Sequence, residues 1–203
     1  KTLKPSLDKS GKELVFSVPS GNFGNICAGM VAREMGLPIS HFIAATNANK
    51  VVPNFMKNGK YQAEKSVATI SNAMDVGDPS NFVRILQMHE NEHGILKKGF
   101  SAYSFTDPQT QEAMRVIEKE HHYTADPHGA VGYLGLLEYQ KDHPNTYGVF
   151  LETAHPVKFL EVVEKTLGKT LTIPHKIVEV LSKQKHATKI SDYQGLKRFL
   201  MQE

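Results

Sequence analysis

The sequence predicts an α/β protein with an open, mostly parallel sheet flanked by helices. Short apolar segments rich in strand-forming residues alternate with segments whose apolar residues recur at helical spacing, through most of the chain. The apolar segment 14–18 is followed by a glycine-containing turn, a helical segment and a second apolar segment at 41–45. Strand, helix and strand at this spacing form a βαβ unit, so the two strands are expected to be parallel.

The first half of the chain contains the clearest element signals. Residues 1–12 are polar and are expected to form a surface lead-in. A helix is predicted over 26–35, because its apolar residues share one face and Gly36 suits the residue that follows a helix. A short helix is predicted over 53–57, and the turn-rich segment 66–79 is predicted to be a long loop.

The second half continues the alternation. Thr106, Asp107 and Pro108 form a strong helix start, since proline is tolerated in the first helical turn. Asp192 is expected to cap the last helix. The predicted elements are a helix over 80–92, a strand over 100–105, a helix over 106–121, a turn at 126–129, a helix over 130–141, a strand over 147–151, a helix over 155–168, and two helices that begin at 174 and 192.

Composition limits the classes of function. Of the 203 residues, 40% are hydrophobic and 22% charged, which is too apolar for a disordered chain. The net charge of +3 is spread along the sequence, so neither nucleic acid nor a membrane is expected as a partner. Cys27 is the single cysteine, which excludes an intramolecular disulfide and a multi-thiolate zinc site. With no signal peptide and no apolar run of ~18 residues, a cytoplasmic protein is expected.

The turn between the first predicted strand and helix, Ser20–Asn25 (SGNFGN), is a candidate anion site. The first N–H groups of a helix have no helical partner, and the helix dipole adds positive charge there. Gly21 and Gly24 allow the backbone to approach a phosphate closely and to adopt positive φ. Neither the dinucleotide fingerprint nor the Walker pattern is complete, so the turn alone leaves open a plain connection that binds nothing.

Five segments resemble, in the same order, segments of the threonine synthases, which are pyridoxal-phosphate enzymes of the tryptophan-synthase-β type. They are SGNFGN at 20–25, FIAATN at 42–47, SNAMDV at 71–76, DPHG at 126–129 and TAHPVKF at 153–159. Together they cover roughly residues 15–160, which makes the resemblance far more specific than the glycine turn alone.

The resemblance implies pyridoxal 5′-phosphate as the cofactor and assigns the residues that hold it. A threonine hydroxyl, carried over onto Thr153, would lie beside the pyridine nitrogen, where it can donate a hydrogen bond without requiring a protonated ring. Glu152 departs from the family, which commonly has glycine before this threonine. The residues whose backbone amides would hold the cofactor phosphate are Gly21, Asn22, Phe23, Gly24 and Asn25.

The resemblance also implies a reaction and a missing group. The complete enzyme would be a lyase of threonine biosynthesis that converts O-phospho-L-homoserine and water to L-threonine and phosphate. In this family the Schiff-base lysine precedes the glycine turn, but only 20 residues precede Gly21, and the lysines of the polar lead-in do not resemble the family's lysine segment. We therefore expect the C-terminal portion of a longer enzyme, with no catalytic residue of its own, inactive without the missing N-terminal part.

Within this interpretation the chain divides into a lead-in (1–12), an α/β domain that binds the cofactor phosphate (13–170) and a helical tail of the same domain (171–203). Side chains available to a substrate phosphate are Asn72, Asp75, Ser80, Asn81, Arg84 and Lys158.

Three alternatives stay open. The first is another pyridoxal-phosphate elimination or replacement enzyme, of the serine or threonine dehydratase type. The second is a non-catalytic relative that binds phosphorylated ligands. The third is a zinc hydrolase, because His89–His93 (HENEH) has the H-E-x-x-H pattern, although Gly94 follows at once and a helix end is the preferred interpretation. Cys27, His128 and His155 are interpreted as packing or structural residues.

Overall fold

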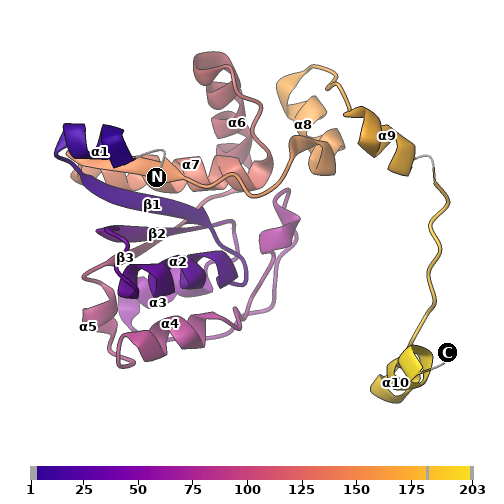
Figure 1. Cartoon of the computed structure of the whole chain (residues 1–203), viewed down its shortest axis with the longest axis horizontal. Helices are drawn as coiled ribbons and strands as arrows, with labels where there is room; N and C mark the ends of the chain where they lie inside the picture. The colour runs from indigo at the N-terminus through magenta and orange to yellow at the C-terminus, as the bar shows by residue number, and fades with distance from the viewer. Residues whose placement is uncertain (1–3, 182, 202–203) are drawn as a thin grey trace. The chain divides into compact units, whose positions relative to one another are not determined.

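The computed structural model describes residues 4–181 and 183–201 and divides the chain into two compact units, Lys1–Leu171 and Thr172–Glu203. The first unit is built on a parallel sheet whose described strands lie in the order β3-β2-β1-β4 (Figure 1). The strands are β1 (Glu13–Pro19), β2 (His41–Thr46), β3 (Phe100–Ser104) and β4 (Thr146–Phe150). The predicted fold class, an open parallel sheet flanked by helices, is confirmed.

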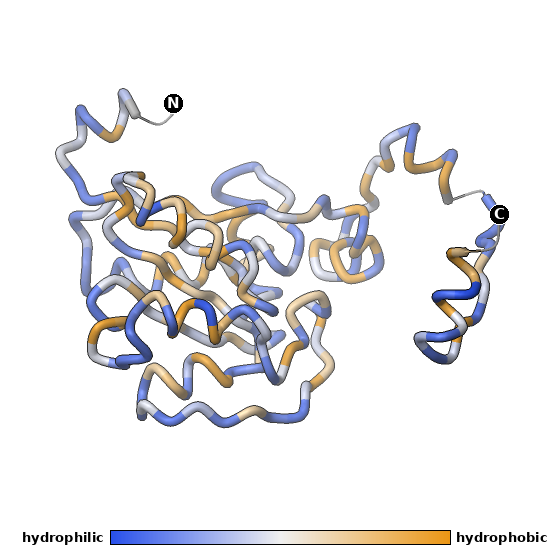
Figure 2. Tube along the Cα trace, turned by 60° about the horizontal axis from the view of Figure 1, so that its bottom comes forward, coloured by the Kyte–Doolittle hydropathy of each residue, from blue (hydrophilic) through white to orange (hydrophobic). Residues whose placement is uncertain are grey.

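The strand register brings the carboxyl ends of the two central strands together. Val15 of β1 lies opposite His41 of β2 and Gly148 of β4, and Pro19 at the end of β1 lies opposite Ala45. Every residue of β2 is buried, as is usual for a parallel strand covered on both faces. The hydropathy colouring of Figure 2 shows apolar and polar segments alternating along the chain.

One face of the sheet is covered by the helices α2 (Gly24–Glu34), α3 (Val51–Asn58), α4 (Phe82–Met88) and α5 (His93–Leu96) (Figure 1). Their apolar residues pack with alternate residues of the strands, because neighbouring side chains of a strand point to opposite faces. The members of this core include Ile26, Met30, Val52, Phe55, Phe82, Ile85 and Leu96, packed with Phe42, Ala44 and Phe100 of the sheet.

The other face is covered by α7 (Pro127–Asp142). The helix α6 (Asp107–His121) packs against α7, and α8 (Leu160–Leu167) packs against α6. Leu136 and Tyr139 of α7 lie in one cluster with Val15 and Ile43 of the sheet. The close approach of α7 depends on Gly135, where a Cβ would lie 2.7 Å from the Cβ of Ala45.

Several predicted boundaries were wrong. The lead-in contains a helix, α1 (Lys4–Ser10). The helix predicted over 80–92 ends at Met88, because Glu90 and Asn91 adopt left-handed backbone angles (φ 57° and 58°). The helix predicted from 155 begins with a 3₁₀ turn, η2 (Pro156–Phe159), before α8.

The segment Asp126–Gly129, predicted to be a turn, is instead the start of α7. Asp126 is its N-cap and accepts a hydrogen bond from the backbone N–H of His128 at 2.8 Å. Pro127 occupies the first helical position, where it needs no N–H partner. The DPHG segment therefore fixes where α7 begins.

The second unit contains α9 (His175–Leu181) and α10 (Tyr193–Met201). The predicted cap of the last helix is present, since the Asp192 carboxylate accepts from the N–H of Gly195 at 2.7 Å. In the part of the chain that the structure describes, no helix combines the length and apolarity that a membrane span requires.

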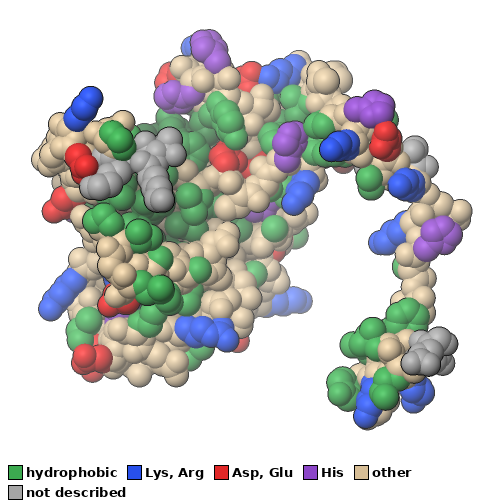
Figure 3. All heavy atoms as spheres, in the orientation of Figure 1, with side chains coloured by type: hydrophobic (Ala, Val, Ile, Leu, Met, Phe, Trp, Pro, Cys, Tyr) green, Lys and Arg blue, Asp and Glu red, His purple; other side chains and the backbone are tan. Residues whose placement is uncertain are grey.

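Figure 3 shows acidic and basic side chains interspersed over the visible face of the molecule.

Candidate cofactor-binding site

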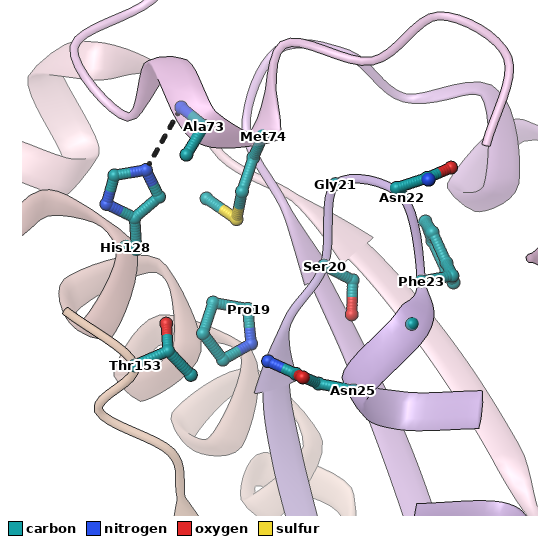
Figure 4. Close-up of a pocket in the computed structure, with 11 residues that line it drawn as sticks. Pro19, Ser20, Gly21, Asn22, Phe23, Asn25, Ala73, Met74, His128 and Thr153 are labelled. Atoms are coloured by element: carbon teal, nitrogen blue, oxygen red, sulfur yellow. Dashed lines mark hydrogen bonds between the residues drawn. The ribbon is translucent and has the colours of Figure 1, made fainter. Parts of the chain in front are cut away.

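A cavity of about 310 Å³ opens at the carboxyl end of β1 (Figure 4). This is the place where open parallel sheets usually bind ligands. The structure brings all six sequence-predicted site residues to it. The lining residues come from the β1–α2 turn, the 72–74 segment, α7 and the segment after β4: Pro19, Ser20, Gly21, Asn22, Phe23, Gly24, Asn25, Ala73, Met74, His128 and Thr153.

The β1–α2 turn adopts one left-handed residue, and it is not a glycine. Phe23, at the N-cap of α2, has φ 62°, whereas Gly21 and Gly24, which could adopt positive φ, do not. Packing holds Phe23 in this conformation, because its buried ring meets the ring of Phe82 edge-on at 5.6 Å. The conformation turns the chain from the strand into the helix within a few residues.

The two glycines of the turn meet different surroundings. A Cβ on Gly21 would lie 2.7 Å from the Cα of Met74 and 2.9 Å from the carbonyl oxygen of Ala73, so the 72–74 segment crosses directly over this residue. A Cβ on Gly24 would meet only the Asn81 amide nitrogen, at an ordinary 3.6 Å. Contacts within the protein therefore require glycine at 21 but not at 24.

The Asn22 side chain bonds to another part of the protein and does not point into the cavity. Its Oδ1 accepts from the N–H of Ser80 at 2.6 Å and from the Ser80 hydroxyl at 2.9 Å. Its backbone oxygen accepts from Nδ2 of Asn81 at 2.9 Å. Figure 4 shows this side chain directed away from Thr153, while the Asn25 side chain is directed toward Pro19 and Thr153. Asn22 can therefore contribute only backbone to a bound ligand.

The electrostatics of the cavity suit an anion. Because α2 begins at Gly24, the first N–H groups of this helix have no carbonyl one turn earlier in the helix, and the helix dipole places positive charge at this end. None of the described residues that line the cavity is acidic. These features fit a cofactor with a phosphate group, and the volume lies at the lower end of the range of small-molecule sites.

The wall next to the turn, the short 3₁₀ helix η1 (Asn72–Met74), is held by a polar network that the sequence did not reveal. Nδ2 of Asn47, just after β2, lies 2.8 Å from both the Thr69 hydroxyl and Oδ1 of Asp75. Asn49 joins it through Oδ1 of Asn47 at 2.8 Å, and the N–H of Thr69 donates to Asp75 at 3.0 Å. The resembling segments 42–47 and 71–76 are thus joined in space through Asn47 and Asp75.

His128 connects α7 to the same wall. Its Nδ1 lies 2.6 Å from Oδ1 of Asp126, and its Nε2 lies 3.2 Å from the backbone nitrogen of Ala73 (dashed in Figure 4). The Ala73 N–H can only donate, so Nε2 must be the unprotonated nitrogen and Nδ1–H donates to Asp126. The structural role predicted for His128 is present, but its place in the cavity was missed because the contact joins residues far apart in sequence.

Other residues singled out in the sequence lie elsewhere. The six side chains considered for a substrate phosphate are not among the residues that line the cavity. His89 and His93 do not lie on one continuous helix: Nδ1 of His89 is 2.8 Å from the carbonyl oxygen of Ile85, and Nε2 of His93 is 3.1 Å from that of Met56. The described residues contain no cluster that could hold a metal ion. Cys27 is buried in the α2 core.

Comparison with known proteins supports the resemblance. A family model described as pyridoxal-phosphate dependent enzyme matches residues 5–151, and one described as threonine synthase, C-terminal, matches residues 129–200. The threonine synthase of Escherichia coli (strain K12) is 46% identical over 168 residues, which are 82% of this chain and 38% of that protein.

Two solved structures agree with the sequence comparison. A crystal structure of threonine synthase from Escherichia coli superposes with a TM-score of 0.81 at 40% identity, covering 94% of this chain and 44% of the other. The PLP-bound threonine synthase from Brucella melitensis gives 0.83 at 27% identity, covering 98% and 48%. This chain thus spans less than half the length of these relatives. On these matches, the chain belongs to the pyridoxal-phosphate dependent enzymes and is a homologue of part of threonine synthase.

Proposed function

We propose that this chain supplies the cofactor-phosphate site of a threonine synthase that converts O-phospho-L-homoserine and water to L-threonine and phosphate. The observation that carries the proposal is that the Gly21–Asn25 turn and Thr153, far apart in sequence, line one cavity. The threonine synthase relatives, which match over most of this chain, support the choice of reaction within the family.

Each part of the cavity has a chemical task in this proposal. The N–H groups at the start of α2 bind the phosphate of the cofactor, as helix N-termini bind anions in many proteins. The Thr153 hydroxyl, exposed to the cavity, orients the pyridine nitrogen by a neutral hydrogen bond. When bound, pyridoxal phosphate supplies the electron-withdrawing ring that stabilises negative charge on substrate carbons.

We further propose that the Schiff-base lysine comes from outside these 203 residues, so that this polypeptide is inactive alone. No lysine is among the described residues that line the cavity. The exposed Lys9 and Lys12 precede β1, and the seven residues of that strand separate its start from the cavity by about 20 Å.

Phosphate release from O-phospho-L-homoserine tests this proposal. We expect none from the 203-residue chain supplied with pyridoxal phosphate, and turnover from a longer polypeptide in which the family's lysine domain precedes the same residues. In the longer polypeptide, Thr153→Val should lower kcat by at least tenfold, while Thr153→Ser, which keeps the hydroxyl, should lose much less. Phosphate release by the 203-residue chain would refute the proposal that the Schiff-base lysine lies outside it. A longer polypeptide that binds the cofactor but releases no phosphate would refute the proposed reaction.

A further inference from the structure

Glu152, the residue before Thr153, places its carboxyl group inside the protein beside the cofactor cavity. Both carboxyl oxygens are buried, although the neighbouring Thr153 is exposed. The carboxyl occupies the space that a side chain on residue 129 would take, so Gly129 in the first turn of α7 is what admits it. Glu152 therefore links the segment after β4 to the start of α7.

Glu152 is electrostatically linked to a second carboxyl group. Asp126, which is fully buried, accepts from the N–H and the ring Nδ1–H of His128 through its Oδ1. Its Oδ2 and both oxygens of Glu152 receive no hydrogen bond from any N–H or hydroxyl group of the described residues. The Asp126 and Glu152 carboxyl groups shift each other's pKa in opposite directions. Three buried carboxyl oxygens without a donor are costly, and one proton held between the two groups removes most of that cost.

The electrostatics place that proton on Glu152. Burial raises the pKa of Glu152, and the Asp126 carboxyl raises it further. Burial alone would raise the pKa of Asp126, but the hydrogen bonds from His128 and Glu152 lower it overall. Burial, followed by the carboxyl groups of Glu152 and Asp126, also raises the pKa of the Tyr123 hydroxyl, on the segment before α7.

We propose that Glu152 is protonated in the folded chain and donates to Oδ2 of Asp126, and that Glu152, Asp126, His128 and Ala73 form one hydrogen-bonded chain that positions the walls of the cavity. This series of hydrogen bonds begins at Glu152, one residue before Thr153, and ends at the backbone of Ala73. It therefore couples the two sides of the cavity that flank the β1–α2 turn. Glu152 and Asp126 are positioning residues in this scheme. Neither the cofactor nor the reaction is needed for this protonation and geometry.

Thermal unfolding of the 203-residue chain and its Glu152→Gln variant tests the protonation. A carboxyl with a raised folded-state pKa contributes fully below its unfolded value of about 4.3, and this contribution is lost as pH rises toward the folded-state value. Glutamine keeps the shape and the donor but does not titrate. We therefore expect the Tm of Glu152→Gln relative to the parent to rise by about 5 °C or more between pH 5 and pH 8.

A matched control is Glu161→Gln, since Glu161 is exposed in the first turn of α8. Its Tm difference from the parent should stay constant over the same pH range. An equally constant difference for Glu152→Gln would overturn the proposal, because Glu152 would then be ionised in the folded chain.

Nitrogen NMR of the parent chain gives a second reading that needs no variant. His128 should show a protonated Nδ1 and an unprotonated Nε2 at pH 7, and Glu152→Gln should preserve this tautomer.

Hydrogen exchange of the Ala73 amide tests the positioning role. In Glu152→Ala this exchange should accelerate at least tenfold, whereas Glu152→Gln should keep the slow rate of the parent. The opposite tautomer in the parent, or an Ala73 amide that exchanges equally fast in all three chains, would contradict the positioning role.

Discussion

Gly21 and Gly24 belong to the same turn, but only Gly21 is required by the contacts around it. The Ala73–Met74 backbone passes where a Gly21 side chain would project. Phe23, rather than either glycine, takes the left-handed conformation that starts α2. The residues of the turn thus have different roles. Gly21 leaves room for the crossing of the 72–74 segment, and Phe23 adopts the conformation that turns the chain. The backbone N–H groups remain for the candidate ligand.

Gly21→Ala should destabilise the folded chain by about 1–3 kcal/mol, because the new methyl group must displace backbone rather than a mobile side chain. Urea unfolding measures the effect. Gly24→Ala is the matched control, and we expect it to change the free energy of unfolding by less than about 0.5 kcal/mol, as its Cβ has room. Equal losses for both variants would show that the crossing over Gly21 is not tight.

His41, the first residue of β2, is expected to make the stability of the folded chain depend on pH. Its ring stacks on Tyr139 with centroids 4.6 Å apart, and its Nε2 lies 2.9 Å from the Ser101 hydroxyl. Burial, followed by the charges of His143 and Arg33, lowers the pKa of His41 to about 4. The folded chain therefore keeps His41 neutral at pH values where the unfolded chain protonates it.

The folded-state pKa of His41 lies below its unfolded value of about 6.5, so its contribution is fully present above that value and is lost as pH falls toward 4. The free energy of unfolding is expected to fall by about 3 kcal/mol once the pH is below both pKa values. Urea unfolding of the parent and of His41→Gln from pH 7.5 to 4.5 should show the parent losing stability faster. Parallel curves would mean that His41 is accessible to protonation in the folded state.

At the scale of elements, the loop that carries the short 3₁₀ helix η1 is ordered by a network of partly buried polar groups. The Asp75 carboxylate accepts from the side chains of Asn47 and Thr69 and from the backbone of Thr69. Asn49 adds a bond to the carbonyl oxygen of Val67 at 2.9 Å. Removal of the Asp75 carboxylate leaves several partly buried donors without this acceptor, which costs more than one lost bond.

Asp75→Ala should therefore destabilise the chain by about 2 kcal/mol or more and accelerate amide exchange selectively over residues 67–75. Hydrogen-exchange mass spectrometry resolves the segment. Asp142→Ala, at the exposed end of α7, is the matched control and should leave both quantities nearly unchanged. Uniform acceleration along the whole chain in Asp75→Ala would contradict a role confined to this loop.

The two central strands were predictable from sequence because β1 and β2 each contain a short apolar run that is buried within the sheet, so hydrophobicity marks them directly. The edge strands β3 and β4 are mostly half-buried and give a weaker signal. The helix ends were less predictable. The break at Glu90 and Asn91 depends on left-handed residues for which the sequence holds no glycine signal, and the DPHG segment reads as a turn until Asp126 is seen to cap α7. The lead-in helix α1 lacks the apolar periodicity that would have revealed it.

At the scale of the whole molecule, the candidate site arises where four distant segments meet at one edge of the sheet. The turn and Thr153 could be named in advance, because a family resemblance marked them. Contacts such as Ala73 with His128, and the carboxyl pair of Asp126 and Glu152, could not, since they depend on how α7 and the 72–74 segment approach each other. Sequence patterns locate the ligands of a site more readily than the residues that position them.

The central claim, that the β1–α2 turn and Thr153 form a pyridoxal-phosphate site, can be tested by NMR titration of the isotope-labelled 203-residue chain. Adding pyridoxal 5′-phosphate should shift the amide resonances of residues 21–25 and 153 in a saturable way, inorganic phosphate should shift those of 21–25 alone, and pyridoxal without its phosphate should shift neither group at the same concentration. Saturable shifts that bypass these residues, or equal responses to pyridoxal with and without its phosphate, would contradict the assignment.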